Sequence, residues 1–104
     1  MFDLAWAKGR DRGETTFSGL ALVMECEWNW DPESLEIDFS KLMVARAERR
    51  LFVFEQRNAD EVDEVIEECK RIVRRFSGTI PGDRYLFAGY ALNEERFIYH
   101  IWVA

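Results

Sequence analysis

The first part of the chain alternates hydrophobic and polar residues with the two-residue period of β-strands. This pattern predicts strands over residues 2–8 and 20–28, joined by a hairpin connection in the Gly-, Thr- and charge-rich stretch 9–16. Because alternate side chains of a strand point to opposite faces, Glu25 and Glu27 share one face of the second strand. That face is apolar where the strand starts and acidic where it ends.

The pattern then changes to the spacing of amphipathic helices. Asp31 and Pro32 are typical of a helix start, and they predict a helix over residues 33–49. In residues 62–76, apolar side chains recur at i, i+3, i+4 and i+7, which predicts a second helix. Asn58 is in the right place to cap this helix, whose first half is acidic and whose last turns are basic.

Three further strands complete the predicted order ββαβαββ. They lie at residues 51–56, 84–92 and 96–103. The connection from 20–28 to 51–56 has the length of a parallel crossover. We find no linker, so residues 1–104 are interpreted as a single α/β or α+β domain, with a mixed β-sheet and two helices.

Composition narrows the class of protein. The 104 residues are 48% hydrophobic and carry a formal net charge of -6, which suits one folded core and argues against a protein that coats nucleic acid by charge alone. No run approaches the ~18 apolar residues of a membrane span, and the start of the chain lacks a signal-peptide pattern. Cys26 and Cys69 are predicted to be reduced thiols, so a cytoplasmic protein is expected.

Carboxylates on the first two strands are the candidate chemistry. If these strands pair, Asp3 comes close to Glu25 and Glu27, and converging carboxylates suit Mg²⁺. A metal held there could activate water for attack on a phosphate. The plainer interpretation is that Asp3 is an exposed residue near the terminus and that the two glutamates form the solvent face of a half-buried strand.

This arrangement resembles the PD-(D/E)XK, or restriction-endonuclease-like, superfamily. The resemblance covers the first half of the chain: Asp3 on one strand, then Glu25-Cys26-Glu27 on an apolar strand, then a helix and the apolar run 51–54. It implies a restriction-endonuclease-like core and Mg²⁺-dependent hydrolysis of DNA phosphodiesters. It also implies that Asp3 and Glu25 are metal ligands and that Glu27 binds metal or orients water.

Two positions differ from the pattern of that superfamily. Phe2 stands where a proline precedes the aspartate, and Glu27 replaces the lysine. Lys41 on the following helix, or Lys8 on the first strand, could then supply the positive charge.

Other residues give weaker signals. His100 is the only histidine and is interpreted as a packed or interface residue, because a zinc site needs further ligands. Arg46, Arg49 and Arg50 are expected to end the first helix, either as a solvated face or as a contact for DNA. No Gly-rich phosphate loop is present, so no nucleotide cofactor is expected.

The C-terminal strand suggests association. FIYHIWVA is apolar on both faces, so it is either central in the sheet or an edge that pairs with another subunit, and a homodimer is expected. The leading hypothesis is a small nuclease-like domain, active or an inactive remnant. The alternative is a non-catalytic dimerisation or protein-interaction module, and a ferredoxin-like sensor is a third.

Overall fold

A computed structural model describes residues 4–8, 19–45 and 47–104, with side chains from Leu22 onward. The elements, in chain order, are β1 (Leu4–Lys8), β2 (Gly19–Glu27), α1 (Pro32–Val44), β3 (Ala47–Gln56), α2 (Ala59–Arg75), β4 (Arg84–Ala91) and β5 (Arg96–Val103). This order confirms the predicted ββαβαββ sequence of elements. The predicted hairpin connection at residues 9–16 lies outside the described residues.

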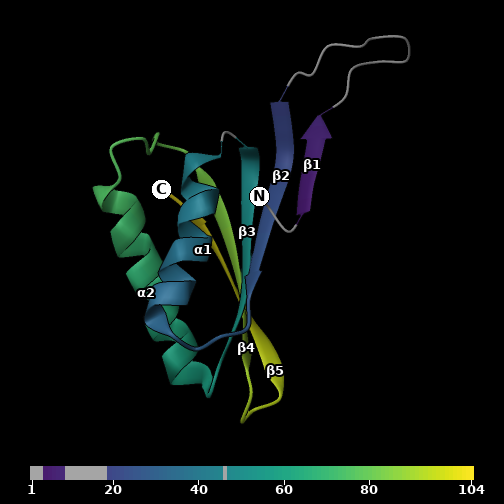
Figure 1. Cartoon of the computed structure of the whole chain (residues 1–104), viewed down its shortest axis with the longest axis vertical. Coiled ribbons are helices and arrows are strands. Elements are labelled where there is room, and N and C mark those ends of the chain that lie inside the picture. The colour runs from purple at the N-terminus through teal and green to yellow at the C-terminus, as the bar shows by residue number, and fades with distance from the viewer. Residues whose placement is uncertain (1–3, 9–18, 46) are drawn as a thin grey trace.

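The described strands form a five-stranded mixed sheet in the order β1-β2-β3-β4-β5. β2, β3 and β4 are parallel, as predicted for the first crossover, and the two outer pairs are antiparallel. Since both crossovers progress in the same direction along the sheet, α1 and α2 lie on the same side of it (Figure 1). The helices therefore cover one face, and β5 is an edge strand. Neither helix in the described part is long and apolar enough to cross a membrane.

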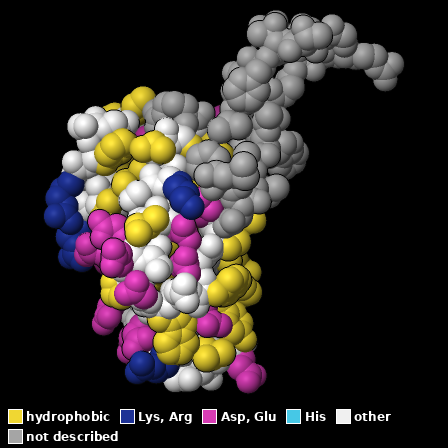
Figure 2. Space-filling view, viewed as in Figure 1, with side chains coloured by type: hydrophobic (Ala, Val, Ile, Leu, Met, Phe, Trp, Pro, Cys, Tyr) yellow, Lys and Arg dark blue, Asp and Glu magenta, His cyan; other side chains and the backbone are white. Residues whose placement is uncertain are grey.

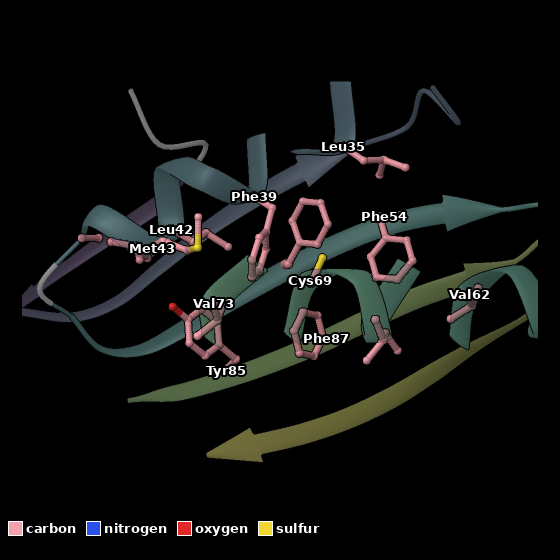
Figure 3. Packing of buried hydrophobic residues seen from close by; sticks show 14 of the residues in the cluster. Leu35, Phe39, Leu42, Met43, Phe54, Val62, Cys69, Val73, Tyr85 and Phe87 are labelled. Carbon is pink, nitrogen blue, oxygen red and sulfur yellow. The ribbon is translucent and has the colours of Figure 1, made fainter. Parts of the chain in front are cut away.

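The hydrophobic core lies between the two helices and the sheet. Phe39 projects from α1 and is fully buried against Phe52, Tyr85 and Phe87, with ring centroids 5.4 to 5.9 Å apart (Figure 3). Val62 and other apolar residues of α2 pack beside α1 in the same cluster (Figure 3). Aromatic pairs at these distances add to the stability that burial of their area supplies.

The helix predicted over residues 33–49 is too long. α1 ends at Val44, Ala45 is extended, and the next described residues begin β3. The cause is Arg50, which is 1% exposed: its Nε donates to the Leu42 carbonyl at 2.9 Å and its Nη2 to the Ala45 carbonyl at 2.6 Å. The guanidinium thus supplies donors to the end of α1, where a cation also complements the helix dipole.

This change also corrects the interpretation of the basic residues. Arg49 and Arg50 belong to β3 and point to opposite faces of the sheet, so they do not form one basic helix end. Arg46 lies outside the described residues.

Candidate functional site

Glu25 and Glu27 both point from β2 toward α1, but Glu25 is not at a solvent face. It is 1% exposed and follows Val23, which is also buried. The glutamate face of β2 is therefore the face that the helices cover. The interpretation of Glu25 as part of a solvated strand face is wrong, because it was based on polarity rather than on the side of the sheet that the helices occupy.

Lys41 lies directly over Glu25. Its Nζ is 3.6 Å from Glu25 Oε1 and 3.0 Å from Asp38 Oδ1. The hydrogen bond to Asp38, followed by the charge of Glu25, raises the pKa of Lys41 above its ordinary value. The structure thus brings together two of the predicted site residues, Glu25 and Lys41, as a salt bridge between strand and helix.

Asp38 is a member of this cluster that the sequence did not reveal. A side-chain hydrogen bond with Glu27 lowers the pKa of Asp38, and Lys41 contributes in the same direction. Glu27 also accepts a hydrogen bond from the Asn29 amide at 2.8 Å. The i,i+3 spacing of Asp38 and Lys41 was the available signal, since it places both on one face of α1.

The other two predicted site residues are Asp3 and Lys8. Asp3 lies outside the described residues. Lys8 pairs with Gly19, at the other end of β2 from Glu25. Within residues 4–8, 19–45 and 47–104, no group of three or more His, Cys, Asp or Glu side chains is arranged to hold a metal ion.

The pKa of Asp38 leads to a pH prediction. Because this pKa is below its ordinary 3.8, the carboxylate stabilises the fold above about pH 4, and the stabilisation is lost as the pH falls through the lowered value. Asp38→Asn should therefore lower the free energy of unfolding by about 0.5 kcal/mol at pH 7 and flatten its decline below pH 4. Urea unfolding between pH 2 and 7 measures this.

Asp63→Asn is the matched control, because Asp63 is an exposed carboxylate on α2. It should keep the wild-type pH dependence. An equal flattening in both variants would contradict the assigned role of Asp38.

A second candidate site is the face of the sheet that the helices leave open. The side chains of β2 to β5 that point away from the helices form a surface that we call the open sheet face, and two apolar rows cross its centre. In strand order the rows are Met24, Leu51, Leu86 and Ile101, and Cys26, Val53, Ala88 and Tyr99.

The open sheet face is most exposed along β5. Tyr99 is 67% exposed, Ile101 78% and Val103 55%. At one end, the Phe97 ring contacts the rings of Tyr90 and Tyr99, with centroids 5.1 and 5.9 Å apart. Monomeric proteins rarely expose contiguous apolar patches larger than a few hundred Å². This face therefore has the character of an interface.

Charged residues mark the two ends of the open sheet face. Arg49 and Arg84 follow the apolar rows at the end near Val103. Glu55 lies at the opposite end, where its Oε2 accepts a hydrogen bond from Trp30 Nε1 at 2.9 Å. No charged side chain interrupts the two rows among the residues described, so the charges flank an apolar centre.

Comparison with family models, curated proteins and solved structures found no match to this chain. Function is therefore inferred from the geometry of the molecule.

Proposed function

We propose that this protein is a non-catalytic dimerisation module in which two copies pack through their open sheet faces. The observation that carries the proposal is the apolar surface of β5, where Tyr99 and Ile101 are mostly exposed on the face that α1 and α2 do not cover (Figure 1). Packing two such faces against each other would bury the open sheet face of each copy, as in a β-sandwich, with the two sheets about 10 Å apart. Pairing through the edge of β5 alone would leave the same apolar surface in water.

The size of the open sheet face suits a second copy. Four strands at a spacing of about 4.8 Å, each about 27 Å long, give a projected area of about 500 Å². Two copies would bury about 1,000 Å² in total, which is the lower bound for a specific interface. Because the side chains make the surface uneven, the accessible area buried is larger than this flat projection. A self-complementary patch of this size is what a two-fold symmetric dimer requires.

The charges at its ends favour one orientation. A two-fold axis that runs across the strands places Arg49 and Arg84 of one copy over the end that carries Glu55 in the other. An axis along the strands would instead place like ends together, with arginine over arginine. Electrostatic complementarity therefore supports the first arrangement.

Sedimentation equilibrium tests the proposal directly. Across 1 to 200 µM protein, we expect the mass to rise from that of a monomer toward twice 12.3 kDa. High salt should weaken the dimer only modestly, because the centre of the interface is apolar and the charges lie at its ends. A single monomer mass at 200 µM would reject a second copy as the occupant. The proposal would also be rejected if the protein stayed monomeric and bound a different protein through β5.

A Mg²⁺-dependent nuclease of the restriction-endonuclease-like class is the second candidate. It is favoured by the approach of Glu25 to Lys41, because a carboxylate and a lysine beside it are the residue types that the superfamily uses. Under this hypothesis Asp3, Glu25 and Glu27 hold Mg²⁺, and Glu27 and Lys41 act on water and on the DNA phosphodiester. The burial of Glu25 and its salt bridge oppose metal binding, which is why this function ranks second.

Calorimetric titration with Mg²⁺ separates the two candidates. The nuclease hypothesis predicts saturable binding that Glu25→Gln weakens by at least about tenfold, together with Mg²⁺-dependent cleavage of DNA. Asp60→Asn, on the exposed first turn of α2, is the control. The absence of saturable binding up to 20 mM Mg²⁺ would contradict the hypothesis.

A further inference from the structure

The outer edge of β5 is a surface distinct from the open sheet face. β5 ends the described sheet, and its pairing with β4 keeps one register from Arg96 to Val103. Proteins commonly protect such an edge with a bulge, a proline or a lysine, which prevent pairing with another chain. The sequence of β5 contains no lysine or proline, and its one charged residue, Arg96, stands at the first position. Many charged side chains are instead visible over the helices (Figure 2).

The backbone groups that face this edge belong to the odd-numbered residues of β5. In an antiparallel pair, successive residues direct their backbone groups alternately toward the partner strand and away from it. The amide of Ala104 donates to the Asp83 carbonyl at 2.8 Å, and these two residues continue the register of β4 and β5. Even-numbered residues therefore bond to β4. The amides and carbonyls that point outward are those of Phe97, Tyr99, Ile101 and Val103.

This edge can pair with a second copy of itself in one best register. Two antiparallel copies are related by a two-fold axis, and an axis at His100 pairs all of the outward-facing residues. Moving the axis by one residue in either direction leaves Val103 or Phe97 without a partner in the strand of the other copy. The backbone therefore favours the register centred on His100.

The side chains of the two copies match in the same register. On the open sheet face, Tyr99 lies opposite Ile101 of the second copy, and Phe97 lies opposite Val103. On the helical side, Ile98 lies opposite the tryptophan of the other strand. Each pair joins an aromatic and a β-branched side chain, a combination that stabilises antiparallel strands. The sequence of β5 is thus complementary to itself, which identifies a second copy as the partner of this edge.

The edge pairing is compatible with the face-packed dimer. His100 lies level with Phe87, Phe52 and Glu25, and this line runs midway between the two apolar rows. The axis of the face-packed dimer follows the same line when the arginine end of one copy covers the Glu55 end of the other. The axes of the two pairings therefore cross at His100. Perpendicular two-fold axes that cross generate a closed assembly of four chains.

We infer that face-packed dimers join through their β5 edges into a tetramer that contains two continuous sheets. The tetramer rests on the proposed face-packed dimer, whereas the edge pair by itself does not. The edge is only one strand wide, and its backbone groups exchange hydrogen bonds to water for hydrogen bonds to each other, so it is the weaker contact. Dimers should therefore form first, and tetramers at roughly millimolar concentration.

Small-angle X-ray scattering measures the mass of the assemblies between about 0.2 and 2 mM protein. The wild type should change from two chains to four, from twice to four times 12.3 kDa. Over this range, amide hydrogen exchange at Tyr99 and Ile101 should slow about tenfold, while exchange at His100, which already bonds to β4, should stay constant. A mass that stops at two chains would overturn the tetramer. A mass that grows beyond four chains would also overturn it, because it indicates an open-ended contact.

An N-methyl group on the amide of Tyr99 blocks the edge without changing any side chain. Ligation at Cys69 joins residues 1–68 to a synthetic segment 69–104 that carries the methyl group. This protein should remain a dimer at 2 mM, whereas the unmodified ligation product should form tetramers. Circular dichroism checks that both products are folded. Tetramers of the methylated protein at the same concentration as the unmodified product would contradict pairing through the β5 edge.

Leu51→Asp distinguishes a failure of the edge pairing from a failure of the face-packed dimer. Leu51 lies in an apolar row on β3, away from the β5 edge, so the aspartate disrupts face packing alone. The folded variant should be monomeric at 0.2 mM and form dimers near 2 mM, which N-methylation of Tyr99 abolishes. If it stays monomeric and the wild type stops at two chains, the edge pairing is rejected and the face-packed dimer stands. If the wild type forms only dimers that N-methylation abolishes, the face-packed dimer and the tetramer are rejected.

Discussion

Replacing Ile101 by aspartate is expected to convert the dimer into a folded monomer. Ile101 is 78% exposed in the single chain, so an aspartate there meets water and costs the monomer little. In the dimer the same carboxylate would be buried without a cation, and the two-fold symmetry introduces it twice. We therefore expect the dissociation constant of the dimer to rise at least about a hundredfold in sedimentation equilibrium.

Ile37→Asp is the matched control for this change. Ile37 is also an exposed isoleucine, 56% accessible, but it lies on α1 and away from the open sheet face. This variant should dimerise like the wild type. If Ile37→Asp dissociates the dimer and Ile101→Asp does not, the interface lies on the helical side. A folded Ile101→Asp variant that dimerises with unchanged affinity would likewise contradict the proposed interface.

Arg50→Met is expected to lower the free energy of unfolding by about 3 kcal/mol and the Tm by about 15 °C. The methionine keeps much of the volume but removes the donors to the Leu42 and Ala45 carbonyls at the end of α1. It also removes the cation 3.5 Å from Asp83, which is only 12% exposed. Loss of one member of a buried ion pair is costly because the other charge stays desolvated.

Urea unfolding in the Ile101→Asp background measures this effect without a contribution from dimer dissociation. Arg49→Met is the control, because the neighbouring Arg49 side chain is 61% exposed. It should change the free energy of unfolding by no more than about 0.5 kcal/mol. Similar effects of the two substitutions would show that Arg50 contributes no more than a surface arginine.

The two helices show how far local patterns determine the fold. α2 was predicted almost to the residue, because its amphipathic period and the Asn58 cap agree. The end of α1 was missed because residues 47–50, Ala-Glu-Arg-Arg, are all strong helix formers. Pairing with β2 and burial of Arg50 outweigh that preference. Both effects come from contacts distant in sequence, which no local window contains.

The candidate sites were likewise predictable only in part from local sequence. Alternation and apolarity predicted that β5 has two hydrophobic faces, but its place at the sheet edge depends on strand order. Glu25 was singled out from its strand, whereas its burial depends on which side the helices cover. Asp38 escaped prediction because its role arises where α1 packs on β2.

Arg50 also has a consequence for how the chain finds its correct strand alignment. If β3 slipped by one position, Arg50 would turn to the open sheet face and Leu51 would take its place beneath α1. The misaligned form would keep a hydrophobic interior but would lose both donors at the helix end. The buried guanidinium therefore selects the correct register of β3. Hydrophobic residues on both faces of this strand would stabilise either register to a similar extent, whereas Arg50 destabilises the shifted one.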